Sequence, residues 1–211
     1  MSGSEELLRL GDAMRVLADD GLRWSGDDPY HHDRYERLRR LAAEVFALAD
    51  ERGADDIEQT VFSMLTHVSP MTGGEAAIVD DRERILLIQR SDDRLWAMPG
   101  GLFNMEETAA EGVAREAREE AGVEVDVLEL IGVYDSRLCG SQAQLQIYHF
   151  VFLCRDLARV PATTPHEVLD SAWFAERELP PLSPGHALRV PDVFRYLRAP
   201  RAIFDTLRPS S

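Results

Sequence analysis

Residues 101–123 read GLFNMEETAAEGVAREAREEAGV, and this stretch decides the fold. Glu106, Glu107 and Thr108 favour a helix start, because negative charge at that position complements the helix dipole. Just upstream, the Pro-Gly-Gly sequence at 99–101 interrupts the chain after an apolar segment. The predicted order is therefore a strand, a glycine loop and an acidic helix.

Three glutamates of the predicted helix, Glu116, Glu119 and Glu120, stand at positions i, i+3 and i+4. At about 100° per residue they project within a sector of roughly 100°, so their oxygens converge on one patch. Hard carboxylate oxygens are ligands for Mg²⁺ or Mn²⁺. Gly112, one turn earlier on the same side, predicts that a metal or phosphate approaches the backbone there.

The alternative interpretation is a solvated helix face whose glutamates form ion pairs with neighbouring arginines. The residues beside the glutamates favour the metal site instead. They form an apolar stripe that predicts packing on a sheet, with the carboxylates left at the rim. The stripe consists of Ala110, Val113, Ala117 and Ala121.

Written as a pattern, the stretch is Gly-x5-Glu-x7-Arg-Glu-x-x-Glu-Glu-x-Gly-Val, which resembles the signature of the Nudix hydrolases. Ala117 departs from it, because the family usually carries a larger aliphatic residue there; we expect a closer helix-to-sheet contact. The resemblance implies an α/β fold, a three-layer α/β/α sandwich with a mixed sheet. It also implies metal-dependent hydrolysis of a nucleoside diphosphate linked to another moiety.

Carried across position by position, the resemblance implies that Glu116, Glu119 and Glu120 bind Mg²⁺ or Mn²⁺, with the Gly100 carbonyl as a further ligand. Arg115 and Glu107 look like residues that orient these glutamates. Neutralising a pyrophosphate and positioning a water for attack are tasks that such bound cations perform.

The catalytic base has several candidates. Nudix enzymes use either a glutamate of the signature, here Glu119 or Glu120, or an acidic or histidine side chain from a later loop. In this chain the later candidate is Glu167, with Asp170 second, because residues 163–170 precede a β-like run. A carboxylate within reach of a metal-bound water would serve as base.

The chain changes character near residues 69–74. Residues 1–69 show helical periodicity in three segments, near 7–17, 35–48 and 57–65, whereas residues 70–211 contain β-like runs. We expect a small N-terminal helical domain and a Nudix domain. In the first, the sequences GLRW at 21–24, DPY at 28–30 and DRYE at 33–36 resemble the extension of a Nudix subgroup that includes CDP-choline pyrophosphatases. This resemblance implies a homodimer and a contribution to the substrate pocket, with Tyr30 stacking on a base as one candidate.

In the second part, runs at 76–79 and 85–88 flank a turn and predict a hairpin. Further strands are predicted at 125–134, 145–153 and, as the last, 172–174, followed by a helix at 191–197. Residues 146–151 alternate along a strand, and which side faces a substrate pocket is left open.

Composition narrows the functional class. The 38 acidic and 23 basic residues give a net charge of −15, which argues against duplex nucleic acid as partner and predicts local cations for a nucleotide substrate. Arg90 and Arg137 are the candidates for substrate binding. Two cysteines, no long apolar run and no basic, apolar leader predict reduced thiols, no membrane partner and a cytoplasmic enzyme.

The signature does not specify the substrate. A proline that accompanies ADP-ribose specificity in some Nudix enzymes is absent, since Arg137 and Leu138 occupy that region. Two alternatives to the primary interpretation remain: a pyrophosphatase that removes oxidised deoxynucleoside triphosphates, and a Nudix module that senses a nucleotide without cleaving it.

Overall fold

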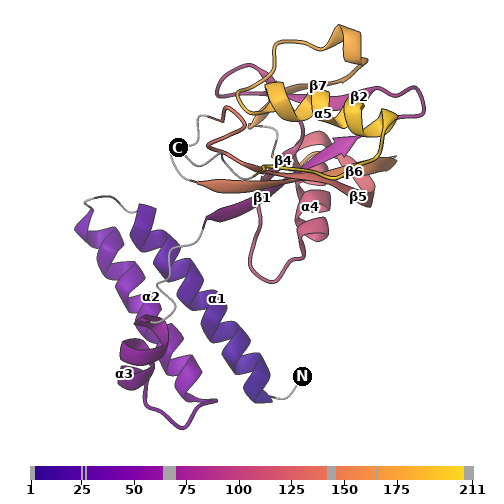
Figure 1. Cartoon of the computed structure of the whole chain (residues 1–211). Coiled ribbons are helices and arrows are strands. Elements are labelled where there is room, and N and C mark those ends of the chain that lie inside the picture. The colour runs from indigo at the N-terminus through magenta and orange to yellow at the C-terminus, as the bar shows by residue number, and fades with distance from the viewer. Residues whose placement is uncertain are drawn as a thin grey trace, which may run out of the picture. The chain divides into compact units, whose positions relative to one another are not determined.

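A computed structural model of the chain describes residues 3–24, 26, 28–63, 70–141, 146–164 and 166–206. It divides into two compact units, residues 1–69 and residues 70–211 (Figure 1). The helices and helical turns are α1 (Gly3–Trp24), α2 (Pro29–Ala47), α3 (Ala54–Asp56), η1 (Ile57–Phe62), α4 (Ala109–Ala121), η2 (Glu176–Glu178) and α5 (His186–Arg198). The strands are β1 (Met71–Ile78), β2 (Ile85–Arg90), β3 (Trp96–Ala97), β4 (Gly100–Leu102), β5 (Val123–Asp135), β6 (Ile147–Arg159), β7 (Val168–Phe174) and β8 (Ile203–Phe204).

The first unit is an antiparallel helix pair closed by a short helical segment. Gly21 of α1 admits the Tyr35 ring of α2, because a Cβ at residue 21 would lie 2.2 Å from a ring carbon. A small core of Ala42, Ala43, Ile57 and Phe62 joins α2 to η1. The three predicted helical segments are confirmed as far as residue 63; the end of the third lies outside the described residues.

The second unit contains a five-stranded sheet, in the order β4-β1-β6-β5-β8, and a three-stranded sheet, in the order β3-β2-β7. Strand β1 pairs in parallel with β6 and antiparallel with β4. The predicted hairpin is confirmed at its turn, where Val79 and Ile85 form an antiparallel bridge and the Asp80 N–H donates to the Arg84 carbonyl. The predicted pairing along the two strands is wrong, because β2 pairs with β7 in the other sheet.

Two apolar cores cover the faces of the sheets. Ala77 faces one core together with Val190 and Val193 of α5, whereas Ala76 faces the other with Val113 and further residues of α4. Because neighbouring residues of a strand point to opposite faces, α4 and α5 lie on opposite sides of the strands, as Figure 1 shows. The expected three-layer α/β/α arrangement is confirmed.

The C-terminal elements differ from the prediction. Strand β7 begins at Val168, well before residue 172, and β8 follows as the last strand. Helix α5 begins at His186 and contains Pro191 inside it. Buried side chains on α5, including Val190 and Val193, hold the helix in place. Proline removes one helical hydrogen bond, and this packing tolerates the loss.

Candidate active site

Helix α4 has the local signals that define both its ends. Thr108 accepts a hydrogen bond from the Glu111 N–H, and the Glu111 carboxylate accepts one from the Thr108 N–H, which makes a complete capping box. Gly122 ends the helix in the left-handed region, with φ of 62°. Because Val113 and Ala117 are fully buried, the glutamates of the helix are turned toward strand β4.

Two glycines of β4 let this strand lie close to its neighbours: Gly101 lies against Glu116 of α4, and Gly100 lies against β1. A Cβ at Gly101 would stand 2.5 Å from Glu116 Oε1, and one at Gly100 would stand 2.3 Å from the Gly74 carbonyl oxygen. No real side chain tolerates such distances. The Gly100 N–H donates to Glu120 Oε2 at 2.8 Å. The glycine loop thus fixes the orientation of the two carboxylates.

Arg115 holds the remaining acidic groups. Its Nε and Nη2 donate to the two oxygens of Glu107, at 3.0 and 2.9 Å, and Nη2 also reaches the Leu102 carbonyl. Its Nη1 donates to Glu116 Oε1 at 2.7 Å and to Glu119 Oε2 at 3.2 Å. Hydrogen bonds to Glu107 foremost raise the pKa of Arg115 above its usual value. The guanidinium therefore stays charged and orients three carboxylates.

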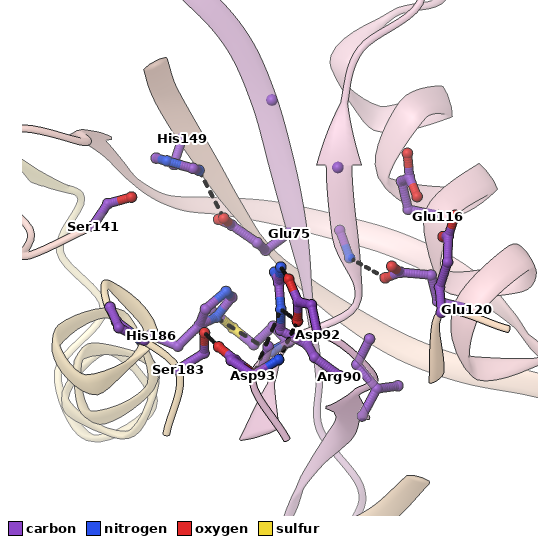
Figure 2. A pocket seen from close by; sticks show the side chains of 18 of the residues that line it. Glu75, Arg90, Asp92, Asp93, Glu116, Glu120, Ser141, His149, Ser183 and His186 are labelled. Carbon is purple, nitrogen blue, oxygen red and sulfur yellow. Dashed lines mark hydrogen bonds and ion pairs between the residues drawn. The ribbon is translucent and has the colours of Figure 1, made fainter. Parts of the chain in front are cut away.

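A pocket of about 770 Å³ opens beside this cluster. Of the predicted site residues, those that line it are Gly100, Glu116, Glu120, Arg90 and Glu167, and Figure 2 shows Glu116 and Glu120 side by side at one end. Glu119 and Arg115 lie on the same helix but are not among the lining residues of this pocket.

The three predicted substrate-binding residues have different surroundings. Arg90 lines the pocket and pairs with Asp92 at 2.5 Å. Arg137 is mostly exposed and pairs with Asp135, outside the lining of this pocket. Tyr30 belongs to the first unit, where its side chain is exposed and its N–H donates to Asp28 at the start of α2. Their roles in binding stay predictions.

The raised pKa values of Glu116 and Glu120 favour a cation at their end of the pocket, which we call the acidic end. Burial, and then the neighbouring carboxylates of Glu119 and Glu107, raise the pKa of Glu116. Burial, and then Glu116 and Glu167, raise the pKa of Glu120 to about 7. A divalent ion would stabilise these charged forms, and carboxylate oxygens are the ligands it prefers, so the donor set fits Mg²⁺ or Mn²⁺.

The carboxylates of Glu116, Glu119 and Glu120 do not form a complete metal-binding site in this structure. Among the described residues, no three His, Cys, Asp or Glu side chains lie together as a metal site. The reason is visible in the contacts: oxygens of Glu116 and Glu119 accept from Arg115, while Glu120 accepts from the Gly100 N–H.

The inference from Gly112 is wrong. A Cβ at this position would meet the Phe103 ring at 2.6 Å and Glu107 Oε1 at 2.8 Å. The group that approaches the helix backbone is therefore an aromatic side chain and the carboxylate that holds Arg115, and no metal or phosphate is needed to explain the glycine.

The loop that carries Glu167 is tied to the end of α4. The backbone N–H groups of Thr163 and Thr164 and the Thr164 hydroxyl all donate to the Glu119 carbonyl, at 3.0 to 3.2 Å. On the other side of the loop, the Ser91 N–H donates to the Glu167 carbonyl. These anchors place Glu167 in the lining of the same pocket as Glu120.

The opposite end of the pocket is polar, and the sequence interpretation did not assign it. Glu75 Oε1 accepts from His149 Nδ1 at 2.8 Å and from Arg189 Nη2 at 3.0 Å, and His186 lies beside them. The alternation of residues 146–151 is thereby resolved, because Ile147 and His149 line the pocket. A charged residue inside an apolar run was the available signal, as at Glu75 in β1 and Arg189 in α5.

Comparisons with known proteins identify the two parts of the chain. A family model described as "NUDIX domain" matches residues 74–195, and one described as "UDP-X-like, N-terminal oligomerisation domain" matches residues 5–61. The Bacillus subtilis (strain 168) protein named "Putative ADP-ribose pyrophosphatase YjhB" is 30% identical over 202 residues, which cover 94% of this chain and 96% of that protein.

Solved structures show the same fold. A crystal structure of UDP-X diphosphatase matches with a TM-score of 0.60 and 25% identity, covering 96% of this chain and 99% of that one. An ADP-ribose pyrophosphatase from Streptococcus suis 89-1591 matches with a TM-score of 0.56 and 27% identity, covering 65% of this chain and all of that one. A family model over more than half of the chain and a full-length relative show that this chain belongs to the Nudix family of hydrolases.

Proposed function

We propose that this chain is a divalent-metal-dependent pyrophosphohydrolase. Its substrate is a nucleoside diphosphate linked to another moiety, and its products are a nucleoside monophosphate and a phosphorylated fragment. The observation that carries the proposal is the acidic end of the pocket, where burial and mutual repulsion raise the pKa values of Glu116 and Glu120. The names of two matches that span nearly the whole chain, "Putative ADP-ribose pyrophosphatase YjhB" and UDP-X diphosphatase, support this substrate class.

Glu116, Glu119 and Glu120, with the Gly100 carbonyl, would hold Mg²⁺ or Mn²⁺. When bound, the metal supplies positive charge against the pyrophosphate oxygens and lowers the pKa of a coordinated water. Arg115 keeps Glu116 and Glu119 in place through the bonds of its Nη1. Arg90, which lines the pocket, attracts the phosphates of the substrate.

Glu167 is the proposed general base. The anchored loop brings its carboxylate into the pocket lining near Glu120, whose pKa it raises. A carboxylate at this place accepts the proton of the attacking water. The three hydrogen bonds from Thr163 and Thr164 to the Glu119 carbonyl keep the loop fixed while the proton is transferred.

The test is a product-resolved hydrolysis screen with Mg²⁺ and Mn²⁺ over ADP-ribose, UDP-sugars, CDP-choline and oxidised deoxynucleoside triphosphates. We expect a nucleoside monophosphate as product, and a loss of turnover of at least about 100-fold in Glu120→Gln. Release of pyrophosphate from a triphosphate would contradict the proposal, and so would binding without any cleavage. Turnover unchanged in Glu120→Gln would exclude the metal assignment.

The first unit supports a proposal of a homodimer. Large apolar side chains at Leu10, Leu17 and Trp24 recur every seven residues along α1 and are between 42% and 60% exposed. Such a stripe lies on one helix face and is a surface that a second helix covers. The family description of this region names oligomerisation.

Light scattering after size exclusion checks the dimer. We expect Leu17→Glu to give a monomer, because a charge inside the covered stripe stays unpaired. Glu36→Gln on α2, at an exposed position, is the control and should remain dimeric. A dimer that persists in Leu17→Glu would show that α1 does not form the interface.

We also propose that the enzyme acts in the cytoplasm. Both cysteines, Cys139 and Cys154, are buried and free, as reducing conditions favour. In the described part of the chain, no helix is long and apolar enough to cross a membrane.

A further inference from the structure

The pocket has two chemically different ends. Figure 2 shows Glu116 and Glu120 at one end, and Glu75, His149 and His186 around the other. Gly100 lies between them: its N–H donates to Glu120, and a Cβ there would stand 2.8 Å from Glu75 Cα and Cγ. A ligand that reaches from the acidic end past Gly100 therefore meets the polar end.

The charges of the polar end balance one another. Glu75 is buried, and Arg189, which is also buried, donates to its Oε1 at 3.0 Å. His186 accepts the Met98 N–H at Nδ1, at 3.3 Å, and burial followed by the charge of Arg189 lowers the pKa of this imidazole to about 3. The paired charges of Glu75 and Arg189 and the neutral imidazole of His186 offer no unpaired charge to a phosphate or an ammonium group.

Three buried polar atoms of this end have no hydrogen-bond partner within the described residues. They are Glu75 Oε2, His149 Nε2 and Arg189 Nε. Because the carboxylate can only accept, His149 Nδ1 is the donor of this pair. The unpartnered set is therefore a carboxylate acceptor, a guanidinium donor and an imidazole nitrogen, and buried groups of this kind normally have partners.

Hydroxyl groups can satisfy this set. Each hydroxyl donates one hydrogen bond and accepts others, so two adjacent hydroxyls can donate to Glu75 Oε2, accept from Arg189 Nε and also pair with His149 Nε2. A quaternary ammonium group offers no donor for the Glu75 carboxylate. Because the three atoms are buried, the side chains must rotate to bring them to the ligand.

We propose that the polar end, formed by Glu75, His149 and Arg189, is a subsite for a vicinal diol of the substrate. The diol belongs either to the ribose of the nucleoside or to a sugar in the linked moiety. This inference rests on the proposed function, because it deepens the substrate class of the same pocket. It makes His149 and Glu75 determinants of specificity that act on substrate binding.

Calorimetry on the full-length chain in EDTA, where cleavage is prevented, tests the subsite. The probes are ADP-ribose, its analogue with 2′,3′-dideoxyadenosine, and ADP linked to a hydroxyl-free alkyl group. The three corresponding compounds with uridine in place of adenosine form a second series. We expect one of the two diol-free analogues to bind at least about tenfold more weakly than its parent compound, and the analogue that does so identifies the source of the diol.

Two variants test whether His149 causes the difference in affinity between the parent compound and its diol-free analogue. His149→Phe should bind the parent compound as weakly as the diol-free analogue, because the Nε2 atom that pairs with the hydroxyl is lost. Tyr148→Phe, at the neighbouring exposed position of β6, is the control and should keep the wild-type preference. The wild-type comparison needs no variant and remains decisive if His149→Phe fails to fold.

Equal binding of all three compounds by the wild-type chain would overturn the subsite, and so would no binding of any, or a preference that follows only the base. The proposed function is tested separately by the cleavage screen with Mg²⁺. An enzyme that cleaves the parent and both analogues equally well would keep its proposed function and lose the subsite.

Discussion

Replacing Arg189 by methionine removes the buried partner of Glu75. The guanidinium is 2% exposed and donates to Glu75 Oε1 at 3.0 Å, so the variant leaves a carboxylate in the interior without its charge partner. Breaking a buried ion pair on one side costs about 3–5 kcal/mol of the free energy of unfolding. In a chain of 211 residues, 1 kcal/mol corresponds to a change of about 2–4 °C in Tm. We expect Tm to fall by about 6–20 °C at neutral pH.

The double variant Glu75→Gln with Arg189→Met separates charge from packing. Glutamine still accepts from His149 but carries no charge, so we expect the double variant to be about 2 kcal/mol more stable than Arg189→Met alone. A matched control is Arg198→Met on the same helix, where the pair with Glu176 has both side chains exposed. Such a pair contributes less than about 1 kcal/mol.

Urea unfolding of five proteins, followed by circular dichroism, gives the required free energies: the wild type, Arg189→Met, Glu75→Gln, the double variant and Arg198→Met. The reasoning is refuted if Arg189→Met is no less stable than Arg198→Met, since the buried charge would then cost nothing. It is also refuted if the two single changes add in the double variant, because Glu75 and Arg189 would not be coupled.

Two further predictions concern the glycine loop and acid stability. Gly101→Ala should lower kcat by at least about tenfold, because its Cβ would displace the Glu116 carboxylate, whereas Gly53→Ala, with open space around it, should leave kcat unchanged; steady-state kinetics would contradict the contact if both variants behave alike. Burial foremost, together with the nearby charge of Arg189, lowers the pKa of His186 to about 3, while Glu75 opposes this. The unfolded chain binds this proton near pH 6.5, so stability is full above that pH and falls as the pH drops toward 3, by about 2 kcal/mol at pH 5. Urea titrations at pH 7.5 and pH 5 check this, and a His186→Phe variant with the same acid loss would remove His186 as the cause.

The parts that the sequence predicted well are those with local signals. Helix α4 begins after Thr108 and ends at Gly122, and both boundaries depend on contacts within a few residues. The burial of Ala117 follows from its place in the apolar stripe. The three-layer fold followed from the resemblance that this helix carries. The roles of Glu116 and Glu120 stay predictions that their place in the pocket supports.

The parts that it missed depend on contacts between distant segments. The polar end of the pocket joins Glu75, His149 and Arg189, which share no local pattern. The hairpin prediction failed beyond its turn, because alternation identifies a strand without identifying its partner. Gly112 signalled a close approach, but its sequence context did not show that the neighbour is Phe103.

The pairing of β1 with β6 also affects the order in which parts of the chain can fold during synthesis. Residue Met71 pairs with Ile147, 76 positions later, so the central ladder cannot close until β6 has left the ribosome. The helices α1 and α2 contact each other within the first 47 residues and can form long before then. Strand β1 therefore stays unpaired with β6 during a period in which the helix pair can already form.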